Sequence, residues 1–286
     1  MSSAVNKLQD GTIELTINIP WRRVQQAYNK NIETVAKEAN IKGFRKGKAP
    51  KKVVEKNIDK QAVYQEILKN LITDLYVETV KEHQLKPIVN PQINVNSMEE
   101  GKDWQIKAVT CEFPKIELGD YKQAVKKELA VDKIWVPGKD KENKEKATDN
   151  ENQKLDKVFK ALLENVKFSI PAVLLQEEVN RMLSRLIEQT SKLGLTVEQY
   201  LTSIGKNPDQ IKEEYQQQAE QTLKLELILS AIADDQKIEI ADQEVQKMID
   251  AIPEENTKKA FEKEEQKIYI RQLLRKRQAI DNLSKL

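Results

Sequence analysis

A short basic stretch between two predicted helices carries the residues with the clearest chemical potential in this chain. It reads GFRKGKAP at residues 43–50 and places one aromatic ring, Phe44, directly before two cations. Two glycines bracket these side chains, and glycine adopts backbone conformations that other residues resist. We expect a tight hairpin that suits docking onto a surface made partly of RNA and partly of protein. The residues assigned to this docking loop are Lys42, Gly43, Phe44, Arg45, Lys46, Gly47, Lys48, Pro50 and Lys51.

The positive charge of the chain is concentrated around this loop. Residues 42–60 contain eight lysines and arginines against two acidic residues, a net charge of +6, whereas the whole chain of 286 residues carries +2. A basic loop is usually no more than a solvated surface. Charge focused on one short stretch indicates instead a local attraction for anions such as phosphates.

The chain offers little that would support catalysis. His83 is the only histidine, and it falls near the end of a predicted helix, where a cation interacts favourably with the helix dipole. The single cysteine, Cys111, lies in a predicted strand and is interpreted as a buried, inert thiol. The sequence has no Cys/His cluster for zinc and no phosphate-binding P-loop. We therefore expect no enzymatic activity, no catalytic residue, no metal and no cofactor.

The docking loop is expected to belong to an N-terminal α+β domain at residues 1–115. Thr12–Ile19 alternates apolar and polar residues, which is the pattern of a half-buried strand. Helical and strand-like segments follow it in an order typical of an α+β domain. They are a helix from Trp21, a short helix at Pro50–Asn57, a long helix at Lys60–His83, and strands at Ile88–Val95 and Trp104–Phe113.

Residues 116–153 are predicted to be a linker. Between Val136 and Gln153 the chain is almost entirely polar, its charges alternate in sign, and Pro137 and Gly138 interrupt it. That composition is typical of a flexible, solvated connector.

Residues 154–286 are predicted to form an all-α domain with helical arms. Apolar residues recur there at helical spacing, and we expect helices to end near Gly194 and Gly205. A capping box at Thr196 and an N-cap at Asn207 with a first-turn proline mark two helix starts. Several helices with short connections make an antiparallel bundle or a set of projecting arms. Asp242–Ile252 and Pro253–Leu283 are predicted as the last two helices.

The composition indicates the class of protein and the cellular compartment. Charged residues make up 33% and hydrophobic residues 39% of the chain, which suits an elongated helical protein with thin cores. No run of about eighteen apolar residues is present, so we expect no membrane partner. The chain starts without a basic segment followed by an apolar one, and a single cysteine allows no intrachain disulfide. The simplest expectation is a cytoplasmic protein.

The loop and four further segments resemble trigger factor, the bacterial chaperone family that meets nascent chains at the ribosomal tunnel exit. GFRKGKAP is similar to the ribosome-docking signature of that family. The similarity covers most of the chain except about residues 126–153. The other matching segments are TIELTINIPWRRVQQAYNKNIETVAKEANIKGF before the loop, PKIELGDYK at Pro114–Lys122, FSIPAVLLQEEVNRML at Phe168–Leu183 and KIEIADQEVQKMI at Lys237–Ile249.

The resemblance implies an ATP-independent chaperone whose helical arms bind nascent or unfolded polypeptides. Its implied partners are a large-subunit protein and rRNA at the tunnel exit, together with client chains, and dimerisation off the ribosome is a further implication. Most family members carry an FKBP-like prolyl isomerase domain, but only about 35 residues separate PKIELGDYK from the helices, so we expect a form without it. The residues assigned to client contact are Leu175, Val179, Met182, Leu186 and Met248.

Two alternatives to the chaperone stay open at this point. An RNA-binding module would use the cations of the loop, although single-stranded RNA recognition usually requires several aromatic residues on one platform. The loop has one aromatic residue, and aromatic residues make up 5% of the chain. A scaffold or adaptor protein would account for the C-terminal helices but would leave the charge around the loop without a role.

Overall fold

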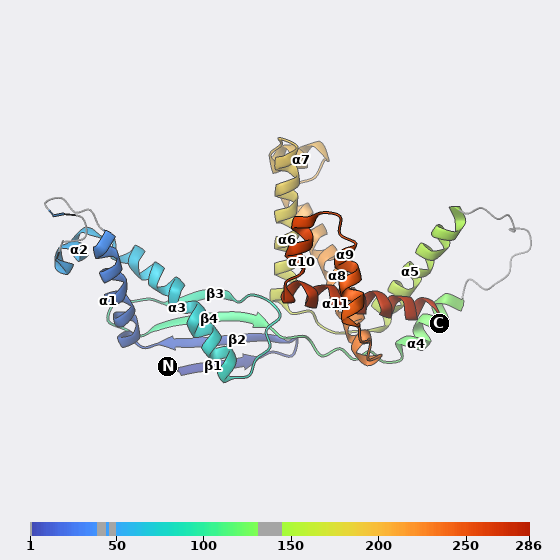
Figure 1. Ribbon diagram of the computed structural model, residues 1–286, viewed down its shortest axis with the longest axis horizontal. Helices are drawn as coiled ribbons and strands as arrows, with labels where there is room; N and C mark the ends of the chain where they lie inside the picture. Colours follow the sequence, from blue (N-terminus) through green and yellow to red (C-terminus); the bar gives the residue numbers. More distant parts are fainter. Residues whose placement is uncertain (1, 39–43, 46–49, 131–144) are drawn as a thin grey trace, which may run out of the picture. The chain divides into compact units, whose positions relative to one another are not determined.

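The structure is a computed structural model that describes residues 2–38, 44–45, 50–130 and 145–286. Its internal contacts divide the chain into two compact units, Met1–Pro114 with Pro171–Leu174, and Lys115–Ile170 with Leu175–Leu286. The first unit combines strands and helices, and the described part of the second is helical (Figure 1). This confirms the predicted α+β fold class.

The first unit is built on a four-stranded antiparallel sheet in the order β1-β2-β4-β3. β2 pairs with β4 so that Leu15 lies opposite Ala108, and on its other side Leu15 lies opposite Val5 of β1. The sequence did not predict β1, and the third strand begins later than predicted, after Pro91. The strands are β1 (Ser2–Lys7), β2 (Thr12–Ile19), β3 (Gln92–Ser97) and β4 (Trp104–Cys111).

The two faces of this sheet differ in polarity. The odd-numbered residues of β2 and the even-numbered apolar residues of β4 are buried in one cluster that also contains Val24 and Ile67 from the helices. On the opposite face Glu14 forms an ion pair of 2.7 Å with Lys107, and Gln105 donates a hydrogen bond to Asn18. An antiparallel sheet with one packed and one solvated face requires this alternation.

Three helices accompany the sheet, namely α1 (Trp21–Glu38), α2 (Lys51–Asn57) and α3 (Lys60–Glu82). The backbone N–H of Trp21 donates to the Asp103 carboxylate at 2.8 Å, which fixes the start of α1. Asp59 caps α3 by accepting a hydrogen bond from the backbone N–H of Gln61. The predicted helix-end position of His83 is confirmed, because it is the C-cap of α3.

Contacts distant in sequence hold β1 in place. The His83 ring lies 2.9 Å from the Ser3 hydroxyl, and the Lys7 ammonium lies 2.9 Å from the Glu112 carboxylate. The hydrogen bond from Lys7, together with one from the backbone N–H of Lys86, holds the pKa of Glu112 below its usual range. Cys111 is fully buried in β4, as predicted.

Eight helices are described in residues 121–130 and 145–286. They are α4 (Tyr121–Ala130), α5 (Glu145–Asn165), α6 (Ala172–Lys192), α7 (Val197–Ser203), α8 (Pro208–Asp235), α9 (Asp242–Asp250), α10 (Glu255–Phe261) and α11 (Glu264–Ser284). The single helix predicted at Pro253–Leu283 is therefore two helices. They are separated at Lys263, where neither glycine nor proline marks a boundary in the sequence.

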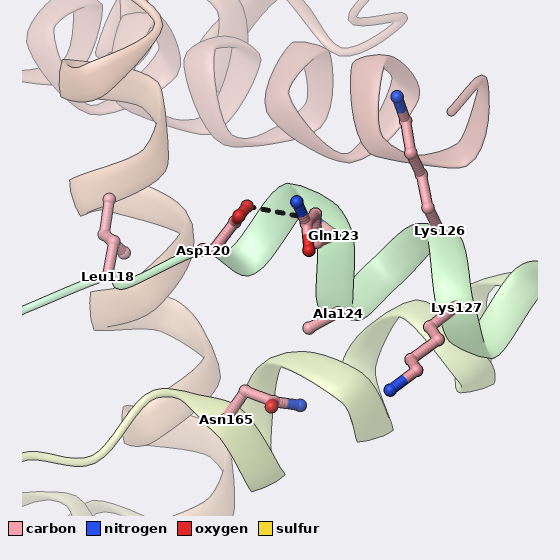
Figure 2. Close-up of a pocket in the computed structure, with 7 residues that line it drawn as sticks. All are labelled: Leu118, Asp120, Gln123, Ala124, Lys126, Lys127 and Asn165. Atoms are coloured by element: carbon pink, nitrogen blue, oxygen red, sulfur yellow. Dashed lines mark hydrogen bonds between the residues drawn. The ribbon is translucent and has the colours of Figure 1, made fainter.

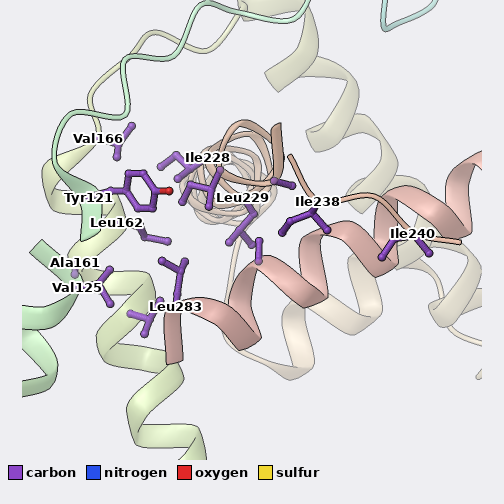
Figure 3. Close-up of a cluster of buried hydrophobic side chains, with 14 of the residues drawn as sticks. Tyr121, Val125, Ala161, Leu162, Val166, Ile228, Leu229, Ile238, Ile240 and Leu283 are labelled. Carbon is purple, nitrogen blue, oxygen red and sulfur yellow. The ribbon is translucent and has the colours of Figure 1, made fainter. Parts of the chain in front are cut away.

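The structure corrects the predicted linker at residues 116–153. Tyr121 and Val125 of α4 are buried in the main core of the helical unit, beside Leu162 of α5 and Ile228 of α8 (Figure 3). The hydroxyl of Tyr121 also donates a hydrogen bond of 2.8 Å to Asp235 at the end of α8. α4 is thus a packed element, and α5 begins at Glu145, inside the predicted linker.

Helices α6, α7 and α8 form an arm of the helical unit (Figure 1). They pack through a small cluster with one buried residue from each helix, Leu186, Leu201 and Ile211. Both predicted glycine stops are confirmed, because Gly194 and Gly205 follow α6 and α7 with φ angles of 72° and 68°. The predicted caps are confirmed as well: Thr196 and Asn207 each form a capping box with the glutamine three residues later.

Candidate functional site

The docking loop lies between α1 and α2, and four of its nine assigned residues are described. Phe44 is 41% exposed, and Arg45 beside it is also exposed. Pro50 and Lys51 are the other two. Lys42, Gly43, Lys46, Gly47 and Lys48 lie outside the described residues.

The C-terminal flank of the loop is fixed to the domain by backbone and side-chain contacts. Pro50 is the N-cap of α2, and its carbonyl accepts hydrogen bonds from the N–H groups of Val53 and Val54. Val54 is fully buried, whereas Lys51 extends to the Asn29 side chain of α1, with 3.0 Å between ammonium and amide oxygen. These contacts hold the end of the loop on a rigid helix pair, which limits the entropy lost when the loop binds.

The five residues assigned to client contact differ in how far their side chains are buried. Val179 and Leu186 are only 4% and 5% exposed, and Leu186 belongs to the core of the arm. These two assignments are therefore wrong for direct contact, because both side chains pack inside the protein. Leu175 and Met182 are half-buried on α6, and Met248 is half-buried on α9.

The end of the arm carries exposed apolar side chains that the sequence analysis missed. Ile187, Leu193, Leu195 and Ile204 are all exposed, with Leu193 reaching 69%. A cavity of about 390 Å³ lies beside them, lined partly by Leu186, Leu193 and Tyr200. The helical stripe could not reveal Leu193 and Leu195, because they flank the glycine at which α6 has already ended. Ile187 lies within α6, and Ile204 is the C-cap of α7. Exposed apolar side chains that gather at one end of an element are typical of interaction surfaces.

An open apolar groove of about 480 Å³ lies between α8, α9 and α11. Leu225 and Leu229 line it from α8, Met248 from α9, and Leu273 and Leu274 from α11. An ion pair of 2.5 Å between Glu226 and Lys276 also lines the groove. The predicted Met248 therefore lies at a surface where a flexible thioether can contact an apolar ligand.

A third cavity, of about 570 Å³, is lined mainly by polar residues at the start of α4 and the end of α5 (Figure 2). Its lining includes Asp120, Gln123, Lys127 and Asn165. The Asp120 carboxylate accepts a hydrogen bond of 3.2 Å from the backbone N–H of Gln123 and thereby caps α4.

Across residues 2–38, 44–45, 50–130 and 145–286, no group of three His, Cys, Asp or Glu side chains is arranged to hold a metal ion. Among the helices of the same ranges, none is both long enough and apolar enough to cross a bilayer.

Comparison with known protein families identifies the chain along nearly its whole length. A model described as bacterial trigger factor protein matches residues 1–146, and one described as the C-terminus of that protein matches residues 139–285. Together with the fold, these matches define the class of the protein as a molecular chaperone. The chain belongs to the trigger factor family. The two matches overlap and leave no stretch for an isomerase domain between them, as the short spacing between PKIELGDYK and the helices predicted.

Individual relatives agree with this assignment. Trigger factor of Staphylococcus epidermidis is 22% identical over 389 aligned positions, which cover 89% of this chain and 90% of that protein. Because this chain has 286 residues, at least 103 of the 389 aligned positions contain no residue of this chain. Trigger factor of Natranaerobius thermophilus is 30% identical over 165 residues, covering 58% of this chain and 36% of that protein. Trigger factor of Lactiplantibacillus plantarum is 35% identical over 123 residues, covering 43% and 28%.

A solved structure shares the fold. It is described as "Promiscuous Substrate Recognition in Folding and Assembly Activities of the Trigger Factor Chaperone" and aligns with a TM-score of 0.67. The alignment covers 100% of this chain and 99% of that chain at 14% identity. At this level of identity the likeness concerns the architecture and not the individual contacts.

Proposed function

We propose that this protein is an ATP-independent chaperone that docks on the ribosome and binds nascent or unfolded polypeptides at the tunnel exit. The observation that carries the proposal is the exposed Phe44 beside Arg45, on a loop whose surrounding segment, residues 42–60, has a net charge of +6 in a chain of net charge +2. Membership of the trigger factor family supports the same role.

In the proposed docking step, aromatic and cationic side chains divide the contact between them. Phe44 inserts into an apolar gap on a large-subunit protein, while Arg45 and Lys46 contact rRNA phosphates or acidic side chains. The surrounding lysines raise the rate of encounter through long-range attraction. Because Lys51 and Pro50 are held on α2, the loop keeps a fixed base during this contact.

The proposed client contacts are the exposed residues of the arm tip and the groove beside Met248. Both surfaces are apolar and open, so they can hold different unfolded segments by weak contacts without demanding one sequence. Folding of the client removes its exposed apolar surface and ends the contact, which requires no nucleotide. Catalysis of prolyl isomerisation is not part of the proposal, and acceleration of isomerisation in a proline peptide by this protein would contradict that point.

Salt dependence tests the docking part of the proposal. If the loop neutralises about four phosphates, a fourfold rise in salt should weaken ribosome binding by roughly a hundredfold, with the duplex slope as an upper guide. The measurement is co-sedimentation with bacterial ribosomes across a salt series. Binding that salt leaves unchanged would contradict phosphate contacts, and absence of binding at every salt concentration would favour a free chaperone or an adaptor.

Substitution at the arm tip tests the client part of the proposal. Replacing Ile187, Leu193 and Ile204 by glutamine should weaken client binding about fivefold or more, because each change removes exposed apolar surface. The measurement is the amount of protein needed to suppress aggregation of an unfolded client without nucleotide. A control variant makes the same change at three exposed apolar residues of the first unit, Leu8, Val77 and Ile88. Equal losses in both variants would show that the arm tip has no special role.

A further inference from the structure

A small cavity in the first unit combines aromatic rings with carboxylates. It measures about 230 Å³, and we call it the Tyr64 pocket. We propose that this pocket binds the guanidinium group of an arginine side chain presented by a partner polypeptide. The lining residues used in the argument are Trp21, Tyr28, Glu55, Lys60, Tyr64 and Glu100.

Three aromatic rings supply one half of the recognition. The Tyr64 ring centre lies 5.3 Å from that of Tyr28 and 6.3 Å from that of Trp21. Behind it, the buried ring of Trp104 meets Tyr64 edge-on at 5.5 Å, which fixes the orientation of Tyr64. Tyr28 and Trp21 are only half-buried, so part of each ring remains accessible. Aromatic faces arranged around an opening attract a flat, weakly hydrated cation.

Two carboxylates supply the other half. Glu55 is half-buried and has no ion-pair partner among the side chains that the structure describes. Burial raises the pKa of Tyr28, and the negative charge of Glu55 raises it further, so this carboxylate acts on the ring beside it. Glu100 is paired with Lys60 at 3.1 Å, but both side chains are more than half exposed. An exposed pair of this kind is weak and can be rearranged by a competing cation.

The chemistry of the pocket selects its occupant. Glu55, Glu100 and Lys60 give the lining itself a net charge of −1, so a cation meets two carboxylates at contact distance even though the surrounding segment, residues 42–60, is basic. A guanidinium group can stack on a ring and donate two parallel hydrogen bonds to one carboxylate, which an ammonium group cannot do. The volume suits one side-chain head and not a folded element. A protein segment therefore fits the pocket better than RNA does.

The position of the pocket indicates where the partner comes from. Asn29 lines the pocket and also accepts the hydrogen bond from Lys51 of the docking loop. A protein that docks on the loop could place a basic segment in the pocket, so the choice of partner rests on the proposed function. Recognition of the guanidinium group itself does not, and short peptides test it without the ribosome.

The test is a nuclear magnetic resonance titration of the full chain with the peptide acetyl-Gly-Arg-Gly-amide. The reporters are the indole N–H signals of Trp21, which lines the pocket, and of Trp104, which donates a hydrogen bond of 3.1 Å to the Glu99 carbonyl next to Glu100. The same peptide with citrulline in place of arginine keeps the shape and removes the charge. We expect saturable shifts with the arginine peptide and much smaller shifts with the citrulline peptide.

Single substitutions should change the affinity for the arginine peptide in opposite directions. Glu55→Gln should weaken binding about tenfold, because it removes the charge-assisted hydrogen bonds. Tyr28→Leu should weaken it about fivefold through loss of the aromatic face. Lys60→Gln should strengthen it about threefold, because it frees Glu100 and removes a competing cation. Unchanged amide spectra outside the pocket confirm that each variant is folded.

Three results would overturn the proposal. Equal shifts with the arginine and citrulline peptides would show that charge is not recognised. Stronger shifts with a nucleoside monophosphate would assign the aromatic rings to base stacking on RNA. Absence of any shift at Trp21 would leave the pocket without this ligand, whatever the outcome of ribosome sedimentation.

Discussion

Replacing Phe44, Arg45 and Lys46 together by alanine is expected to abolish co-sedimentation with bacterial ribosomes. An exposed aromatic ring and an arginine are the side chains that most often dominate an interface, each contributing about 2 kcal/mol or more. Loss of both, with a further cation, should lower the affinity at least about a hundredfold. Because Phe44 and Arg45 are exposed and make no core contact, the variant should keep the stability of the parent protein.

Single variants and a charge-matched control distinguish a specific anchor from general attraction to RNA. A control variant with Lys69, Val77 and Lys81 changed to alanine removes one exposed apolar side chain and two cations from the surface of α3. It should bind like the parent protein if the loop is the specific anchor. Simple attraction to RNA predicts that Arg45→Ala matters much more than Phe44→Ala, and that the control loses as much as the loop variant.

Val125→Asp is expected to destabilise the helical unit by about 3 kcal/mol or more. The Val125 side chain is fully buried against the core that α5 and α8 complete (Figure 3). The substitution removes apolar contacts and places a charge among the buried apolar residues of this cluster, which is among the costliest changes in a protein core. Since domains are stable by only about 5–15 kcal/mol, this is a large share of the total. Urea unfolding followed by far-UV circular dichroism measures it.

This prediction distinguishes two interpretations of residues 121–130, a packed helix α4 and a flexible linker. Gln123→Asp adds the same charge two residues earlier, at an exposed position in the first turn, and should change the free energy of unfolding by no more than about 0.5 kcal/mol. A flexible connector would tolerate both substitutions equally. Similar unfolding midpoints for the two variants would therefore return residues 121–130 to the linker that the sequence analysis predicted.

Local signals in the sequence are sufficient to predict much of the fold without any tertiary contact. Alternation along Thr12–Ile19 predicted β2, because a strand with one buried face requires that period. The capping box at Thr196, the N-cap at Asn207 and the glycine stops at Gly194 and Gly205 predicted the helices of the arm. Each of these signals is complete within a few residues. Those residues satisfy their own backbone groups wherever the rest of the chain lies.

Other features of the protein were decided only by the tertiary structure. β1 has two apolar residues in six, and it is a strand because it pairs with β2 and because Lys7 reaches Glu112. α4 lies inside the stretch that was predicted to be a linker, and only the core of the helical unit shows that Tyr121 and Val125 are packed there.

The proposed binding surfaces show the same division between features that local sequence predicted and features that only the tertiary structure decided. The docking loop was predicted because its ring and its cations are consecutive in the chain. The arm tip and the Tyr64 pocket were not predicted, since each collects side chains from separate elements. Leu193 is exposed only because α6 ends where it does, and Glu55 meets Tyr28 only because α2 packs on α1. Exposure and proximity are properties of packing, and they are set when the elements of the chain come together.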